Sequence, residues 1–141
     1  MVDDILKKYP NDVKVVIKNF PLSFHKQAYK AAQYVLAARE QGKYKELYHK
    51  VFDNYKNLKN NEDLPLELAA ELGLNVEKLK EDANSPKIKS LIDEEIKQMR
   101  ESGIPRLSVP KFLINGKEPQ GRSLEAWSNM IDKELKNIKS K

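Results

Sequence analysis

Two short apolar stretches, one near each end of the 141-residue chain, enclose a long block of helical pattern, and this order limits the possible folds more than any other feature. The first stretch, Val13–Phe20, alternates β-branched side chains between two faces, which is typical of a strand covered on both sides. The second, Lys111–Ile114, is a short apolar strand. Residues 23–102 between them carry helical spacing. This order predicts an α/β fold with a helical insertion.

Caps and breakers divide the helical block. Ser23 is the expected N-cap of a helix that Gly42 ends. Asn75, Ser85 and Ser123 are further expected N-caps, the last of them for the final helix. We therefore predict helices over 2–9, 23–41, 43–56, 65–73 and 85–102, a short one after the cap at 75, and a last one from 123 onward.

A two-residue turn is predicted directly after the second strand. Asn115–Gly116 is the strongest hairpin signal in the chain, because both residue types accept positive φ. Glu118–Gln120 would be the return strand. Pro119 restricts that strand to the edge of a sheet, because proline has no N–H to donate.

The chain contains no cysteine. This composition excludes an internal disulfide, metal binding by thiolates and any dithiol redox chemistry carried by these residues alone. His49 and Asp53 could share a helix face, but no third ligand accompanies them, so we expect no metal site. We also expect no cofactor and no catalytic residue within this chain.

Charge and hydropathy exclude two classes of partner. Lysine and arginine total 26, aspartate and glutamate 21, and the net charge is +5, but the two signs are interspersed and no dense basic run occurs. We therefore expect no nucleic-acid partner. No apolar run approaches the roughly 18–20 residues that span a bilayer, so we expect no membrane segment.

Three segments, in this order, resemble the DsbA-like branch of the thioredoxin superfamily, whose members are protein thiol–disulfide oxidoreductases. Residues 6–22 resemble the second half of the family's active-site helix and the strand after it, which ends in Phe20-Pro21-Leu22. The alanine-rich helical block, with Gly42-Lys43-Tyr44 and later Ala69–Leu74, resembles the family's helical insertion. Residues 103–117 resemble its cis-proline loop and following strand.

The resemblance implies one thioredoxin-like domain over 1–141. Its core would be 1–21 and 104–141, and its helical insertion would be 22–103. In the family the sheet has a further strand between the two found here. The resemblance also implies an extracytoplasmic location, periplasmic or secreted.

The same resemblance places a peptide-binding loop at Ser108, Val109 and Pro110. It implies a cis Val109–Pro110 bond, with the backbone of Val109 pairing with an extended polypeptide substrate. Pro110 offers no N–H, which keeps this surface out of the sheet. Taken without the resemblance, Pro110 also fits an ordinary trans proline at the start of a strand.

The chain departs from the family at its start. Family members carry Cys-X-X-Cys at the N-terminus of the active-site helix, where the helix dipole lowers the thiol pKa. Here Met1 falls where that helix is already under way, so the preceding strand, the dithiol and the first helical turn are expected to be missing. We expect the chain to be inactive alone. It would be a fragment of a DsbA-like oxidoreductase or, alternatively, a non-catalytic peptide-binding or interaction module.

Loss of the middle strand would leave two unpaired strand edges. Either Val13–Asn19 and Lys111–Ile114 close up and pair directly, antiparallel, or another chain fills the gap. The second outcome makes self-association an expected property.

Overall fold

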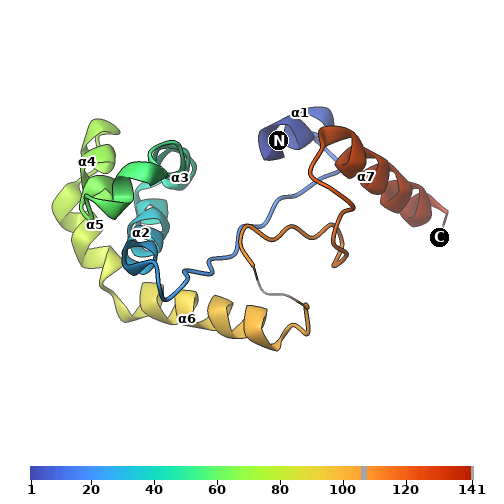
Figure 1. Cartoon of the computed structure of the whole chain (residues 1–141). Coiled ribbons are helices and arrows are strands. Elements are labelled where there is room, and N and C mark those ends of the chain that lie inside the picture. The colour runs from blue at the N-terminus through green and yellow to red at the C-terminus, as the bar shows by residue number, and fades with distance from the viewer. Residues whose placement is uncertain (106–107, 141) are drawn as a thin grey trace. The chain divides into compact units, whose positions relative to one another are not determined.

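Helices account for nearly all the regular structure in the computed structural model, which describes residues 1–105 and 108–140 (Figure 1). In chain order they are α1 (Val2–Lys8), α2 (Lys26–Ala37), the 3₁₀ helix η1 (Ala38–Gln41), α3 (Tyr44–Asp53), the 3₁₀ helix η2 (Tyr55–Lys59), α4 (Leu64–Glu71), α5 (Val76–Ala83), α6 (Pro86–Glu101) and α7 (Leu124–Lys139).

The chain divides into two compact units. A helical unit spans 18–105, and a terminal unit is built from the described residues of 1–17 and 106–141. The helical unit is therefore continuous in sequence, and the terminal unit combines the two ends of the chain. Arg106 and Leu107, which belong to the expected proline loop, lie outside the described residues.

The predicted α/β fold is wrong for the part of the chain that the structure describes. Val13–Phe20 is extended or irregular rather than a strand, and its Val16 side chain is 66% exposed. The only β pairing among residues 1–105 and 108–140 is an isolated antiparallel bridge between Ile114 and Lys117. The expected direct pairing of Val13–Asn19 with Lys111–Ile114 is not formed.

The predicted strand at Val13–Phe20 does not form because it has no neighbouring strand to which its backbone can hydrogen-bond. A strand is stable only when its N–H and C=O groups bond to an adjacent strand. The backbone of residues 14–18 makes no hydrogen bond to the backbone of any described residue. Alternation of apolar side chains shows which faces a strand would have, but it carries no information on whether a partner strand is present.

The helical unit is stabilised by a core of aliphatic side chains and alanines. Leu47 of α3 and Leu79 of α5 are completely buried, as are Ala37, Ala38 and Ala69. A second cluster joins α2 to α6 through Leu36, Ile88 and Ile92. The alanines of α2 and η1 carry no side chain beyond Cβ, which allows α3, α5 and α6 to pack closely on them.

Several predicted helix ends are confirmed. Asn75, Ser85 and Ser123 each accept a hydrogen bond from a backbone N–H in the first turn of α5, α6 and α7. Gly42 ends η1 with a φ of 69°, in the left-handed region that favours glycine. The predicted cap at Ser23 is wrong, because α2 begins at Lys26 without a side-chain cap.

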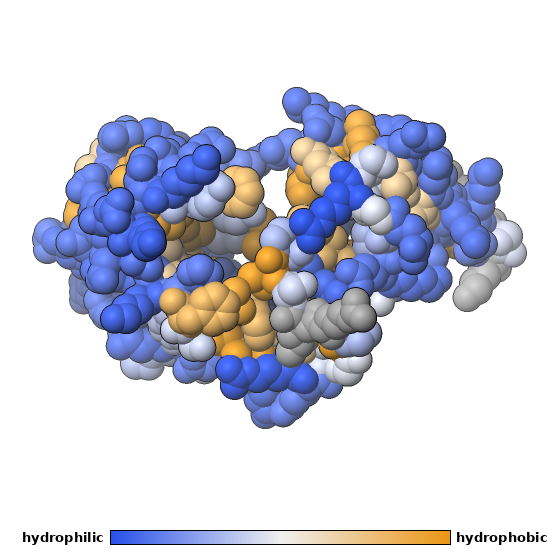
Figure 2. Space-filling model, in the orientation of Figure 1, coloured by the Kyte–Doolittle hydropathy of each residue, from blue (hydrophilic) through white to orange (hydrophobic). Residues whose placement is uncertain are grey.

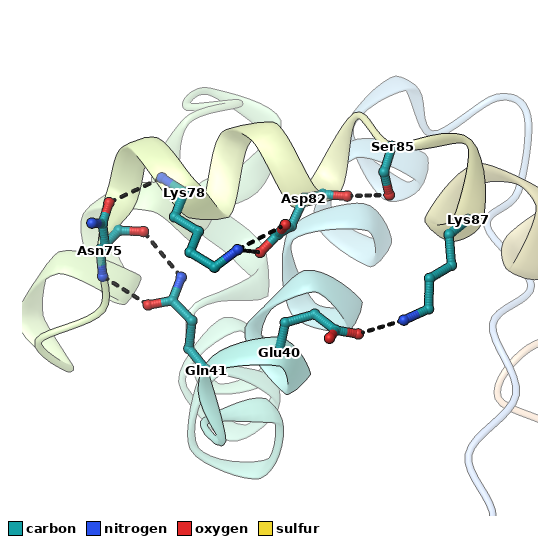
Figure 3. A network of polar contacts seen from close by, with 7 residues as sticks. All are labelled: Glu40, Gln41, Asn75, Lys78, Asp82, Ser85 and Lys87. Atoms are coloured by element: carbon teal, nitrogen blue, oxygen red, sulfur yellow. Dashed lines mark hydrogen bonds and ion pairs between the residues drawn. The ribbon is translucent and has the colours of Figure 1, made fainter.

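A polar network at the start of α5 connects it to η1 (Figure 3). The Asn75 N–H donates to Gln41 Oε1 at 2.9 Å, and Gln41 Nε2 donates back to the Asn75 carbonyl at 3.0 Å. Asn75 Oδ1 also accepts from the Lys78 N–H at 2.9 Å. Nearby, Lys87 of α6 forms an ion pair with Glu40 at 2.9 Å. These contacts fix the relative register of η1, α5 and α6.

The terminal unit is built on the packing of α1 against α7 (Figure 1). Ile5 and Tyr9 are buried against Trp127 and Ile131. The Tyr9 hydroxyl donates to Asp132 Oδ1 at 2.8 Å and also lies 3.3 Å from the Ser128 carbonyl oxygen. Apolar burial and the two polar contacts of the Tyr9 hydroxyl therefore join α1 to α7.

Asn75→Ala should lower the free energy of unfolding of the helical unit by about 0.5–2 kcal/mol, because the Lys78 N–H loses its acceptor. Urea unfolding followed by far-UV circular dichroism measures the change. Asn75→Asp is the matched control, since a carboxylate also accepts this bond. Equal losses in the two variants would show that the cap contributes nothing.

Tyr9→Phe should destabilise the terminal unit by about 1–3 kcal/mol, because a charge-assisted hydrogen bond to Asp132 is lost while the ring stays buried. Trp127 is the chain's single tryptophan and lies in this unit, so its fluorescence during urea unfolding reports the loss. Tyr55→Phe is the control, because that ring is 58% exposed and its hydroxyl bonds no described residue. An unchanged midpoint for Tyr9→Phe contradicts the assignment.

Candidate functional site

The predicted peptide-binding residues lie together on an exposed loop of the terminal unit. Ser108, Val109 and Pro110 are all exposed, and the Val109 side chain keeps 41% of its accessible surface. The Val109–Pro110 peptide bond is cis, the isomer that the sequence resemblance implies. The loop therefore presents both a backbone and an apolar side chain to solvent.

Aromatic packing holds the residues that follow the loop. The ring of Phe112 lies 4.7 Å from that of Trp127, centroid to centroid, at an angle of 57°. Trp127 Nε1 donates to the Gly121 carbonyl at 3.2 Å, which fixes the indole at the start of α7. The loop thus rests on the N-terminal end of α7.

Arg122 connects the loop to this aromatic pair. Its Nη2 donates to the Pro110 carbonyl at 3.2 Å, and its guanidinium carbon lies 5.9 Å from the centroid of the Phe112 ring. A guanidinium over a ring face is attracted by the ring quadrupole. One side chain therefore contacts both the proline of the loop and the ring beneath it.

The predicted two-residue turn is confirmed next to the loop. Ile114 and Lys117 exchange both backbone hydrogen bonds, at 2.8 and 3.0 Å. Asn115 and Gly116 have φ values of 47° and 80°, the positive values that a type I′ turn needs. The predicted return strand Glu118–Gln120 is not formed, because pairing stops at this single bridge.

Ion pairs fix the turn and the stretch before it. Lys117 Nζ lies 2.7 Å from Glu134 Oε1, and Asn115 Nδ2 donates to Glu134 Oε2 at 3.2 Å. These two hydrogen bonds lower the pKa of Glu134, with Lys117 the larger cause. Lys111, whose side chain is mostly buried, pairs with Glu118 at 2.7 Å.

The loop residues Ser108, Val109 and Pro110 carry no thiol, imidazole or charged side chain. The chain has no cysteine, and His25 and His49 both lie in the helical unit. Among residues 1–105 and 108–140, no group of three His, Asp or Glu side chains is placed to hold a metal ion. No helix in the same residues is long and apolar enough to cross a membrane.

Comparison with known protein families shows to which family this chain belongs. A family described as thioredoxin matches residues 1–133. This chain belongs to the thioredoxin family. No curated protein and no solved structure matches it. The family match spans both units and extends into α7, and it supports a thioredoxin-type oxidoreductase function in general terms.

Sequence reasoning missed two residues that shape the loop in this thioredoxin-family chain. Trp127 packs on Phe112 and on the residues of α1. Arg122 was not expected to contact the loop at all. The one signal in the sequence for this contact is that Arg122 directly precedes Ser123, the N-cap of α7. Residues at the start of α7 lie next to the residues that follow the loop.

Two open hollows of the thioredoxin-family chain lie within the helical unit, along α5 and α6. The lining of one includes Lys89, Asp93, Glu94 and Lys97, and the other extends along the whole of α5, from Asn75 to Ser85. Both linings mix charges of opposite sign and are nearly flat. Figure 2 likewise shows polar side chains over most of the visible face, with apolar residues in separate patches. The loop at 108–110, rather than a pocket, remains the candidate site.

Lys117→Met should raise the pKa of Glu134 toward its ordinary value of 4.5, because the lysine is the main group that lowers it. The pKa is lowered in the folded protein, so the pair contributes stability above pH ~4.5 and loses it as the pH falls through the lowered value. Titration of the Glu134 carboxyl by NMR measures this pKa in the unmodified chain and in Lys117→Met. Lys136→Met is the control and should leave the titration unchanged. A pKa of 4.5 in the unmodified chain contradicts the ion pair.

Proposed function

We propose that this chain supplies the polypeptide-binding part of a DsbA-like thiol–disulfide oxidoreductase, with Ser108, Val109 and Pro110 as the contact. The observation that carries the proposal is a loop whose Val109 backbone is not hydrogen-bonded to other backbone groups and whose next residue, Pro110, is held by Arg122. Val109 makes no backbone hydrogen bond with another described residue, whereas the Pro110 carbonyl is bound by Arg122. The thioredoxin-family match supports the same assignment.

The contact we propose is addition of an extended segment to the loop. An extended polypeptide binds through its main-chain N–H and C=O groups, and an exposed backbone on the protein is the complementary surface. Val109 offers one N–H and one C=O, and its apolar side chain covers part of the same surface. Pro110 has no N–H, so pairing cannot continue past it.

The redox group would come from outside these 141 residues, because none of them is a cysteine. In a DsbA-like oxidoreductase the thiolate exchanges with a substrate disulfide through a mixed disulfide. The part proposed for this chain is to position the polypeptide for that exchange.

A second function is favoured by the same composition. A chain without any thiol can bind an extended polypeptide and do nothing further to it, which is the behaviour of a non-catalytic interaction module. The two functions share the loop and differ only in whether a dithiol acts beside it.

Val109→Asp should weaken binding of an unfolded polypeptide by at least about tenfold, because an apolar contact in the centre of the interface is replaced by a charge. Fluorescence anisotropy with a labelled, reduced and carboxymethylated polypeptide measures the affinity. Ile138→Asp is the matched control: this residue is also apolar and 61% exposed, but it lies near the other end of α7. Equal losses in both variants, or none, would falsify the contact.

An insulin-reduction assay separates the two functions. The chain itself should not reduce insulin, because it has no thiol. Activity that appears when a Cys-X-X-Cys segment is joined in front of Val2 supports the oxidoreductase. Polypeptide binding that persists without any gain of activity favours the interaction module.

A further inference from the structure

The segment between α1 and α2 keeps its backbone hydrogen-bonding groups open. Residues 13–22 contain no helix, turn or bend, so this stretch of the chain is drawn out (Figure 1). The backbone groups of residues 14–18 bond no backbone group of any described residue. The side chains of Val15 and Ile17 are each 38% exposed, and that of Val16 is 66% exposed. An apolar, drawn-out segment with an open backbone is a template for pairing with a further strand.

The N–H groups at the two ends of this segment identify its open edge. The Val13 N–H donates to the Tyr9 carbonyl at 3.3 Å, and the Asn19 N–H donates to Glu95 Oε2 at 2.7 Å. Along an extended chain, the N–H groups of residues two apart point to the same side, and those of neighbouring residues point to opposite sides. The odd-numbered N–H groups therefore point to the side on which the chain's own acceptors lie. The N–H groups of the even-numbered residues in 14–18 form the open edge.

The sequence of the segment matches an antiparallel copy of itself. Opposite residues in an antiparallel pair share a face, so pairing Val15 with Val15 of a second copy places Val13 opposite Ile17. The same register places Asp12 opposite Lys18 at both ends, because the pair is two-fold symmetric. Apolar side chains then meet apolar side chains on one face, and opposite charges meet on the other.

The neighbouring registers are less favourable. An antiparallel pair centred on Val16 places Lys14 opposite Lys18, and a pair centred on Lys14 places that lysine opposite itself, so like charges meet in both. A pair centred between Val15 and Val16 sets apolar side chains opposite lysines, and it needs the N–H groups of odd-numbered residues. In the register centred on Val15, Lys14 lies opposite the uncharged Val16. Charge and the open edge therefore select the same register.

Both charged residues at the ends of the pair are accessible. Asp12 is exposed, and the side chain of Lys18 is 55% exposed. Lys18 Nζ donates to Gln98 Oε1 at 2.9 Å and lies 4.0 Å from Glu95 Oε1. An ammonium group carries three N–H donors, so Lys18 can bind a further carboxylate while its bond to Gln98 remains.

We propose that residues 12–18 pair with the same residues of a second copy of this chain, as two antiparallel strands centred on Val15. The N–H and C=O groups of Lys14 would bond those of Val16 in the other copy, and an ion pair between Asp12 and Lys18 would close each end. Two strands alone are marginally stable in water, so the dimer would be in equilibrium with the monomer. The proposal does not depend on polypeptide binding at the loop.

Sedimentation velocity of the full chain tests the dimer, and amide hydrogen exchange measured by NMR tests the register. We expect the average mass to rise from that of a monomer toward that of a dimer between about 5 and about 500 μM chain. In the dimer the amides of Lys14, Val16 and Lys18 should gain protection, whereas those of Val15 and Ile17 should not. A chain that stays monomeric over this range overturns the proposal. So does a dimer in which odd- and even-numbered amides are protected alike.

Exchange of the two end charges provides matched variants. Asp12→Lys and Lys18→Asp should each weaken the dimer by at least about fivefold, because like charges then meet at both ends. An equimolar mixture of these two variants should restore the dimer, since each Lys then lies opposite an Asp. Lys14→Asp is the control: it changes the charge equally but lies opposite Val16, so it should not weaken the dimer.

Far-UV circular dichroism confirms that each variant is folded. Recovery in the mixture is specific to the proposed register, because a general loss of structure in either variant would not be repaired by the other. A mixture that dimerises no better than the single variants overturns the assignment. A loss in Lys14→Asp as large as that in Lys18→Asp also overturns it.

Discussion

The contact between α1 and α7 is the interaction on which the terminal unit depends. With no sheet among the described residues, side-chain packing of Ile5 and Tyr9 on Trp127 and Ile131, together with the hydrogen bonds of the Tyr9 hydroxyl, holds α1 to α7. Trp127 has a second role, because it supports Phe112 and thereby the residues after the loop. The position of the candidate binding loop is consequently set by the same indole that closes the core.

The proposed contact at the loop depends mainly on the protein backbone. At the loop, affinity would come from main-chain hydrogen bonds, which carry little sequence preference, with Arg122 and Phe112 providing a fixed base. Such a contact would therefore accept many polypeptide sequences.

Local signals in the sequence predicted local structure well. The caps at Asn75, Ser85 and Ser123, the stop at Gly42 and the turn after Ile114 are all present, because each depends only on a few neighbouring residues. The sheet predicted from Val13–Phe20 is absent from residues 1–105 and 108–140, because a strand depends on a neighbour that alternation cannot reveal. The loop could be placed at 108–110 from a resemblance of motifs, but the contact with Arg122 depends on how α7 packs, which no local pattern encodes.

The division of the chain has a consequence for its synthesis. Residues 18–105 leave the ribosome as one uninterrupted piece, so the helical unit can fold while translation continues. The terminal unit cannot, because α1 is made before the helical unit and its partner α7 is made after it. During that interval the apolar side chains of Ile5 and Tyr9 are exposed to solvent. A chaperone or a neighbouring nascent chain could bind them before Trp127 covers them.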